Sequence, residues 1–381
     1  MQEDRHSASS EDMASNFPRY SAAALGFRNY WYPVAFARDL GRKPKAVTVL
    51  GERIGLFRDR GRVYALQNRC PHRGVPLTTA RCEFAGTISC VYHGWTYELA
   101  TGKLVAALTD GPDSPIRGKA NVRTFPAAER AGMIWVYIGD GAPPPVEQDI
   151  PSELLRPNTV LEGFSEVRPG NWRYAAENGI DEGHAKYLHR TAWWAFSREM
   201  PAWSAIHMAP SGDDGQWLTR IGDQVEFADD YPGLGHWPPK PRPWQKRGRG
   251  AVRVGVRMPC WLLVEQRGWT GFEVYVPSDE KHYLSHLLAV HWTTGASALL
   301  FRAKYRAWFR WLYHGQFNRQ DQWIIEQMQI PPERLYRPDV SITAWRKLCQ
   351  EQTRGEPQTR DHLRPAPVPT GGPAPALSGR R

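Results

Sequence analysis

Two short cysteine–histidine motifs constrain this chain more than any other feature. One residue separates Cys70 from His72, and two residues separate Cys90 from His93. Both pairs lie where branched and polar residues alternate, which is typical of short strands joined by tight loops. Two thiolates and two imidazoles on neighbouring loops can meet at one centre. Such a set suits a structural zinc ion or a [2Fe–2S] cluster, in which one iron takes both cysteines and the other both histidines.

The remaining cysteines and the N-terminus bear on the compartment. The chain has 5 cysteines. An odd number, together with N-terminal residues that lack an apolar stretch, argues against a disulfide scaffold and a secretory signal. We therefore expect a cytoplasmic protein. Cys82 has no histidine at the matching offset, so we assign it no role.

Charge and hydropathy limit the partners. The formal net charge is +10, which suits nucleic acid, an anionic membrane surface or an acidic partner. No apolar run approaches the roughly 18 residues of a membrane span. Residues 236–253 are basic and rich in proline, but no nucleic-acid-binding module surrounds them. We expect no nucleic-acid partner, and a lid over the active site in which an arginine clamp favours a carboxylated substrate.

The chain divides into two units flanked by tails. We expect a tail and lead-in over 1–27, an all-β unit over 28–141, an α+β unit over 142–354 and a Pro/Gly-rich tail over 355–381. In the α+β unit, helices over 171–190, 298–314 and 315–329 accompany an antiparallel sheet with strands around 215–229, 251–266 and 270–290.

A second cluster begins the α+β unit. Asn178, Asp181, His184 and His189 occur within one largely helical stretch. The two histidines are five positions apart, which places them about 140° apart around a regular helix. They converge only if the helix ends or bulges between them. Two histidines and a carboxylate form the facial triad of non-haem Fe(II) oxygenases.

The carboxylate of that triad is not identified by spacing. Asp181 lies on the wrong side of the motif, so another segment must supply the third ligand. The candidates are Asp229, Asp230, Asp279, Asp321 and Glu326. Asp321 lies in a helical stretch, but sequence spacing does not select it.

Taken together, the two motifs resemble those of the oxygenase α subunit of Rieske non-haem iron oxygenases. The likeness extends from about residue 28 to residue 352. A closer likeness is carried by Leu25–Val34, Gly139–Pro145, Asn171–Arg173 and Ala344–Leu348. The resemblance implies that Cys70, His72, Cys90 and His93 bind a Rieske [2Fe–2S] cluster. It also implies that His184, His189 and Asp321 bind the mononuclear Fe(II).

The same resemblance implies the remaining roles and partners. Asp181 is the acidic bridge between an iron histidine and a cluster histidine of a neighbouring subunit, and Asn178 belongs with it to the catalytic set. The protein is then a homotrimer. It takes electrons from a ferredoxin or ferredoxin reductase, and so indirectly from NAD(P)H. It uses O2 on a hydrophobic, aromatic substrate. Dihydroxylation, hydroxylation and O- or N-demethylation stay open.

Two other functions remain open on sequence grounds. One is a Rieske electron-transfer protein without oxygenase activity, against which the second motif argues. The other is a zinc-stabilised binding protein that uses the first motif structurally. The tryptophan-rich region 192–253 departs from the family pattern, and we expect it to shape the substrate pocket.

Overall fold

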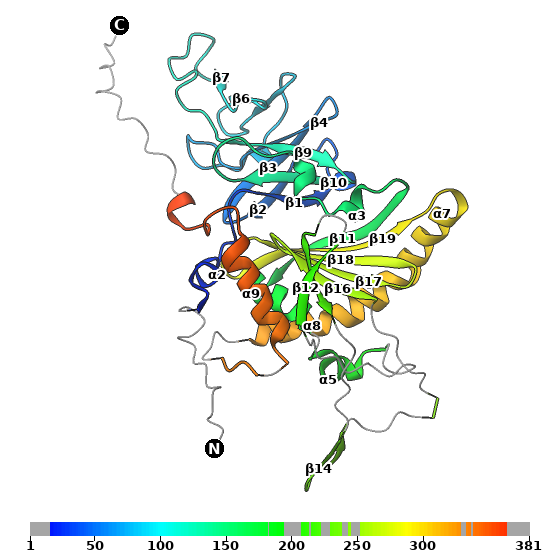
Figure 1. Cartoon of the computed structure of the whole chain (residues 1–381). Helices are drawn as coiled ribbons and strands as arrows, with labels where there is room; N and C mark the ends of the chain where they lie inside the picture. The colour runs from blue at the N-terminus through cyan, green and yellow to red at the C-terminus, as the bar shows by residue number, and fades with distance from the viewer. Residues whose placement is uncertain are drawn as a thin grey trace, which may run out of the picture.

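The computed structural model describes residues 16–181, 183–193, 207–212, 215–221, 229–237, 243–244, 252–328, 333–336 and 338–363. An all-β unit forms the upper part of Figure 1 and an α+β unit lies below it. This arrangement confirms the predicted fold class.

The N-terminal unit consists of three small antiparallel sheets. Their strand orders are β1-β10-β9, β2-β3-β4-β8 and β5-β6-β7. The strands are β1 (Tyr30–Phe36), β2 (Lys45–Val49), β3 (Glu52–Asp59), β4 (Arg62–Gln67), β5 (Thr87–Ser89), β6 (Trp95–Glu98), β7 (Leu104–Ala107), β8 (Thr124–Phe125), β9 (Ala127–Arg130) and β10 (Met133–Ile138). Every residue of β1 and β10 is buried, because these strands lie between the two units.

The C-terminal unit is built on a seven-stranded antiparallel sheet of order β11-β19-β18-β17-β16-β13-β12. Its strands are β11 (Thr159–Pro169), β12 (His207–Ser211), β13 (Trp217–Ile221), β16 (Arg253–Arg257), β17 (Trp261–Gln266), β18 (Trp269–Pro277) and β19 (His282–Trp292); β14 (Asp229–Tyr231) and β15 (Gly235–Trp237) form a separate hairpin. Strands β18 and β19 are almost wholly buried, which explains their nearly continuous apolar sequence.

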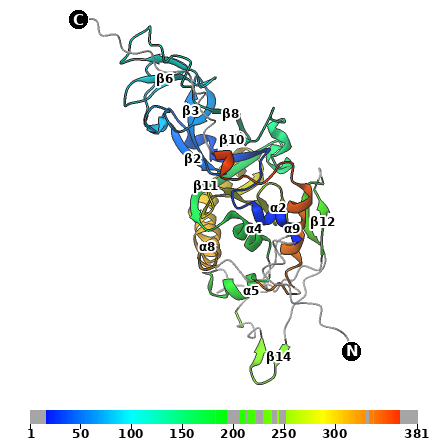
Figure 2. The ribbon, with the colours of Figure 1, turned by 90° about the vertical axis from the view of Figure 1, so that its left-hand side faces the viewer.

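Helices cover this sheet and place the second motif. The described α- and π-helices are α2 (Pro18–Ala22), α3 (Ser152–Leu155), α4 (Trp172–Ile180), α5 (Ala185–Leu188), α7 (Gly295–Lys304), a π-helix (Tyr305–Phe317), α8 (Asn318–Gln327) and α9 (Val340–Gln352), of which α4, α7, α8 and α9 contact the sheet. Helix α4 contacts β16, β17 and β18, and Figure 2 shows it between α8 and α9. The end of α4 therefore faces the start of α8.

One hydrophobic core joins the two units. It includes residues of β1 and β10 together with residues of α4, β17 and β18. The Trp135 and Trp261 rings stack across the junction, with centroids 5.9 Å apart. The His286 Nε2 atom also lies 2.9 Å from the Pro33 carbonyl oxygen. These contacts hold the N-terminal unit against strands β17 and β19 of the large sheet.

Two helical predictions differ from the structure. The helix predicted over 171–190 ends at Ile180 and resumes as the short α5. The helices predicted over 298–314 and 315–329 form one continuous run from Gly295 to Gln327, in which Gly315 lies inside the π-helix. The boundary predicted between residues 314 and 315 is therefore absent, because the helix continues through Gly315 as a π-helix.

Part of each predicted tail packs against the rest of the protein. Residues 355–363 pack against the N-terminal unit rather than forming a tail. Gln358 is 1% exposed, donates to the Leu50 carbonyl oxygen and accepts from Arg28. On the N-terminal side, Tyr20 and Phe27 are buried. Residues 1–15 and 364–381 lie outside the described residues.

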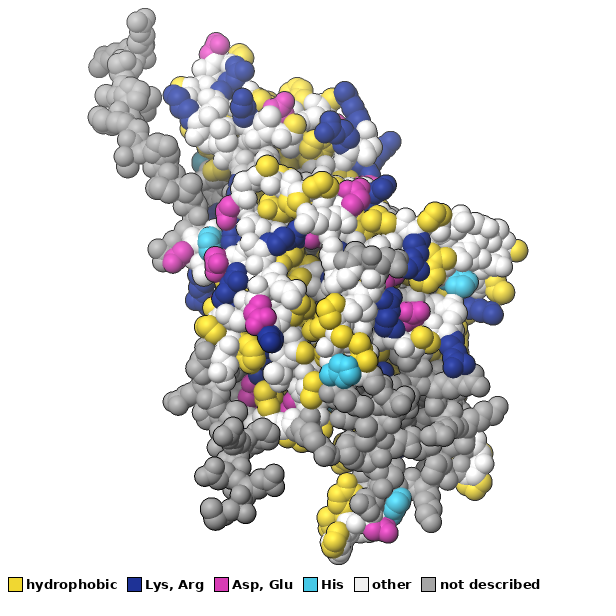
Figure 3. Space-filling model, in the orientation of Figure 1, with side chains coloured by type: hydrophobic (Ala, Val, Ile, Leu, Met, Phe, Trp, Pro, Cys, Tyr) yellow, Lys and Arg dark blue, Asp and Glu magenta, His cyan; other side chains and the backbone are white. Residues whose placement is uncertain are grey.

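The face of the molecule in Figure 3 carries charges of both signs. On the face in Figure 3, Lys and Arg side chains are interspersed with Asp and Glu. Among the described residues, no helix is both long and apolar enough to cross a membrane.

Candidate metal centres

The first motif forms two equivalent turns. The Gly74 N–H donates to the Cys70 carbonyl oxygen, and the Gly94 N–H donates to the Cys90 carbonyl oxygen, each at 2.9 Å. Both glycines have positive φ, +76° and +65°, a conformation that favours glycine. Each turn presents one cysteine and one histidine, so the two loops offer matching halves of a ligand set.

The side chains of the two turns meet. The His72 and His93 ring centroids are 4.5 Å apart, and His72 stacks on Trp95 at 4.8 Å. Both cysteines are buried, Cys70 at 2% and Cys90 at 4% exposure. The two imidazoles are thus adjacent, and both thiols are buried.

This donor set fits a two-iron cluster better than a single zinc ion. Ligand atoms on one zinc lie at most about 4.6 Å apart, because Zn–S bonds are about 2.3 Å. In the described part of the chain, the only group of three or more ligand atoms within 4.8 Å of one another lies elsewhere. The His93 Nδ1 atom is buried without a hydrogen-bond partner there, as expected for a metal ligand.

Tyr97 borders the cysteine side of this centre. Its hydroxyl oxygen lies 3.3 Å from the Cys70 Sγ atom. Burial, followed by the neighbouring thiol, raises the pKa of Tyr97, so this hydroxyl stays protonated and can donate to sulfur. Hydrogen bonds to the sulfur atoms help set the potential of a cluster.

The second motif begins on α4. Asn171 caps this helix, since its side chain accepts from the Arg173 N–H at 3.2 Å. Trp172 and Ile180 are buried, which fixes the face that α4 turns to the sheet. The backbone of Asp181 leaves the helical region with ψ of 106°, and this ends the helix.

The break after α4 brings the histidines together. The Asp181 Oδ1 atom accepts from the Gly183 N–H at 2.8 Å and closes a tight turn. His184 then precedes α5, and His189 follows it in a 3₁₀ turn. The His184 and His189 ring centroids are 5.3 Å apart. The two histidines can therefore converge because the helix ends before them. This is one of the two possibilities expected from the sequence, the other being a bulge within the helix.

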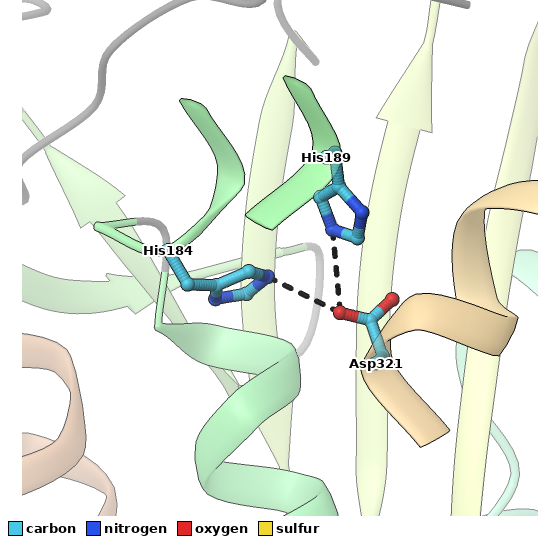
Figure 4. Close-up of side chains that lie close together, drawn as sticks. All are labelled: His184, His189 and Asp321. Carbon is cyan, nitrogen blue, oxygen red and sulfur yellow. Dashed lines mark ion pairs between the residues drawn. The ribbon is translucent and has the colours of Figure 1, made fainter. Parts of the chain in front are cut away.

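Asp321 completes a three-residue group with these histidines. Its Oδ1 atom lies 3.3 Å from the Nε2 atoms of both His184 and His189, as Figure 4 shows. The three ligand atoms lie within 4.8 Å of one another, and this group is the one of its kind among the described residues. His189 is fully buried, and its Nε2 atom makes no hydrogen bond there. These donors fit a facial Fe(II) site.

Each histidine has an acceptor behind it. The His184 Nδ1 atom lies 3.3 Å from the Asp181 Oδ2 atom, and the His189 Nδ1 atom lies 3.0 Å from the Gln320 Oε1 atom. An acceptor at Nδ1 keeps the proton there and leaves the Nε2 lone pair for a metal.

The electrostatics of the group suit a cation. Asn178 donates to the Asp321 Oδ1 atom at 3.1 Å. Burial raises the pKa of Asp321, but the adjacent imidazoles of His184 and His189 outweigh this effect and bring the pKa below its usual range. Burial likewise opposes charge on His184, yet Asp181 and Asp321 raise its pKa to about 10. A metal ion replaces the proton that this group otherwise holds.

The other candidate carboxylates lie elsewhere. Asp279 pairs with His282, Asp230 pairs with His236, and Glu326 accepts from Gln322. The Asp229 side chain lies outside the described residues, as do Trp194, Trp203 and most of the predicted 236–253 lid.

Three residues near His189 were missed by the sequence reasoning. Gln320 orients its ring, Thr191 accepts from the Gln320 amide at 3.0 Å, and Phe317 stacks on the imidazole at 3.6 Å. Amide, hydroxyl and aromatic groups carry no metal-ligand signal. The position of Gln320 next to a candidate ligand is the one clue that the sequence offers.

Comparison with known proteins identifies the family. A family model described as the Rieske [2Fe-2S] domain matches residues 30–126. A second, described as homotrimeric ring hydroxylase, matches residues 137–229 and 240–356. The chain belongs to the Rieske non-haem iron ring-hydroxylating oxygenases. As a member, it has a Rieske [2Fe–2S] cluster and a mononuclear iron as cofactors and O2 as co-substrate.

Relatives of this Rieske oxygenase span nearly its whole length. The carbazole 1,9a-dioxygenase terminal oxygenase component of a Sphingomonas species is 36% identical over 367 residues, 90% of this chain and 96% of that one. The component from Metapseudomonas resinovorans is 31% identical and covers 90% and 95%. The solved terminal oxygenase from Novosphingobium sp. KA1 superposes with a TM-score of 0.78 at 30% identity, covering 92% and 99%. The zinc-stabilised and purely electron-transferring alternatives are thereby wrong.

Proposed function

We propose that this chain is the terminal component of a multicomponent oxygenase and inserts oxygen from O2 into an aromatic substrate. The observation that carries the proposal is the convergence of His184, His189 and Asp321, whose ligand atoms lie within 4.8 Å of one another. In this proposal these residues bind Fe(II), and Cys70, His72, Cys90 and His93 bind the Rieske cluster; together the two metal centres supply the redox chemistry.

The protein groups around the iron site position and connect it. Asn178 orients Asp321, and Asp181 orients His184 from behind. Asp181 is also partly exposed. It is therefore the residue that meets a cluster histidine of the neighbouring subunit in a homotrimer, and it links the two centres between subunits.

Electrons come from a ferredoxin that is reduced by an NAD(P)H-dependent reductase. Solved structures of carbazole 1,9a-dioxygenase include a complex between oxygenase and ferredoxin, which superposes on this chain with a TM-score of 0.79 at 29% identity. A cytoplasmic location fits this partner. It also fits the five cysteines, which are all free of disulfides.

Aromatic side chains near the iron site support an aromatic substrate. Phe317 stacks on His189, and Trp193 follows His189 by four positions in the sequence. The Trp193 ring contacts Trp308 and Trp311 of the π-helix at centroid distances of 6.1 and 5.5 Å. Carbazole, the substrate in the name of the relatives, is the first compound to test.

The test is an iron and acid-labile sulfide assay on anaerobically purified protein, with an EPR spectrum after dithionite reduction. We expect about three irons per two sulfides and a Rieske signal, since the protein has one two-iron cluster and one mononuclear site. In the Asp321→Ala variant the count falls to about two irons while the signal persists. Zinc without sulfide refutes the proposal.

A further inference from the structure

A pocket of about 430 Å³ lies behind His189. The described residues that line it are Leu188, Arg190, Thr191, Gly315, Gln316, Arg319, Gln320 and Trp323. Gln320 and Thr191 belong to the hydrogen-bonded chain on the Nδ1 side of His189, whereas the Nε2 atom faces Asp321. An occupant of this pocket therefore sits behind the imidazole and not at the metal position. Its volume is in the range of small-molecule sites.

The pocket is positively charged. Arg190 and Arg319 both line it, and none of its described lining residues is acidic. The Arg190 guanidinium is held in place, because it donates to the Tyr187 carbonyl oxygen and lies 3.9 Å over the Tyr187 ring. Arg319 makes no hydrogen bond or ion pair with any residue in the described part of the chain. Two guanidinium groups with no acidic side chain among the described lining residues favour a carboxylate ligand.

The pocket also has an aromatic wall. Trp323 is 57% exposed and lines the cavity, although large indole side chains are usually buried. Leu188 adds an apolar surface, while Gln316 and Thr191 add polar groups. An indole beside paired cations suits a planar ring that carries an anionic group.

We propose that this pocket binds a small aromatic carboxylate, with the carboxylate on Arg190 and Arg319 and the ring against Trp323. Its occupancy is communicated to His189 through Gln320. Gln320 lines the pocket and also holds the His189 Nδ1 atom at 3.0 Å. A negative charge behind His189 favours the positive charge of a metal ion in front of it, so the anion and Fe(II) bind cooperatively.

The first test measures benzoate binding to the full-length protein by titration calorimetry. We expect saturable binding that weakens at least tenfold in Arg319→Gln, because a charge-assisted hydrogen bond is lost. Arg53→Gln, which removes an exposed charge from β3 in the other unit, leaves it unchanged. Benzamide, the neutral analogue, binds at least tenfold more weakly than benzoate.

Three results overturn the binding site. They are absence of benzoate binding to the wild type, equal affinity in Arg319→Gln, and equal affinity for benzamide. Benzoate that binds directly to iron gives the second result, so this site is distinguished from direct metal ligation.

The second test measures Fe(II) affinity by chelator competition with and without saturating benzoate. We expect about a fivefold tightening, and by reciprocity Fe(II) tightens benzoate binding by the same factor. Gln320→Leu abolishes the effect, and an unchanged Fe(II) affinity in the wild type overturns the coupling. The coupling between benzoate and Fe(II) binding rests on the proposed function, in which His189 is an iron ligand. If the wild type binds no Fe(II), the proposed function fails, and benzoate binding still tests the pocket.

Discussion

Replacement of Gln320 tests whether the residue behind His189 controls the iron site. The Gln320 Oε1 atom lies 3.0 Å from the His189 Nδ1 atom, and its amide nitrogen donates to Thr191 at 3.0 Å. The amide is thereby oriented so that it accepts from the imidazole. His189 is fully buried, and the leucine side chain fills the space of the amide without offering an acceptor. In Gln320→Leu the Nδ1–H group is left without a partner.

The expected loss follows from these contacts. A buried donor without a partner costs about 1–3 kcal/mol, which corresponds to roughly a 5- to 150-fold change in a binding constant. Loss of a hydrogen bond to a metal-bound histidine typically costs about 10- to 100-fold in metal affinity. We therefore expect the Kd for Fe(II) to rise by about 10- to 100-fold in Gln320→Leu.

The assay is chelator competition for Fe(II), with the Rieske absorption spectrum as a check that the fold is intact. Gln322→Leu is the matched control, because this residue lies on the same helix and donates to the exposed Glu326. Its effect should be less than about twofold, as is usual for a surface change. Gln320→Glu retains the acceptor and adds a negative charge behind His189, so it should bind Fe(II) at least as tightly as the wild type. Equal affinities of Gln320→Leu and Gln322→Leu refute the reasoning.

Three further predictions follow from the same geometry. Asp321→Ala should abolish oxygenation and lose the mononuclear iron while the cluster EPR signal persists; normal turnover would assign the third ligand elsewhere. Asp181→Asn should slow electron transfer from cluster to iron in stopped-flow measurements more than it lowers iron content; a proportional loss of both would make Asp181 a structural support. His286 has its pKa lowered to about 4, chiefly by burial. In the unfolded chain this imidazole is protonated below about pH 6.5, whereas in the folded protein it stays neutral down to about pH 4. Protonation therefore favours the unfolded chain, and the free energy of unfolding decreases as the pH falls below about 6.5. From pH 7 to pH 5 the wild type should lose about 2 kcal/mol relative to His286→Gln in urea unfolding, and parallel pH profiles would contradict this.

Much of the cluster centre can be predicted from the sequence, because each cysteine–histidine pair lies within one short turn. Cys70 and His72 share one tight turn, and Cys90 and His93 share another. A glycine with positive φ closes each turn, so the residue order already contains the local geometry. Only the meeting of the two loops depends on the sheets around them.

The iron site depends far more on the tertiary structure. Asn178 and Asp321 are 143 positions apart, and no periodicity relates two segments at that separation. Their contact requires that α4 and α8 pack together beside the sheet. For this reason five carboxylates stay open on sequence grounds, and one of them lies beside the histidines in the structure.

The sequence by itself determined the chemistry: the residue types of both centres, the two units and the family. The tertiary structure decided which carboxylate joins the histidines, where α4 ends, and that Gln320 and Phe317 border His189. The physical reason is that ligand type and turn geometry are properties of short segments. The contacts of α8 arise instead from the burial of a continuous helical run whose π-helical part shifts its faces away from the 3.6-residue period.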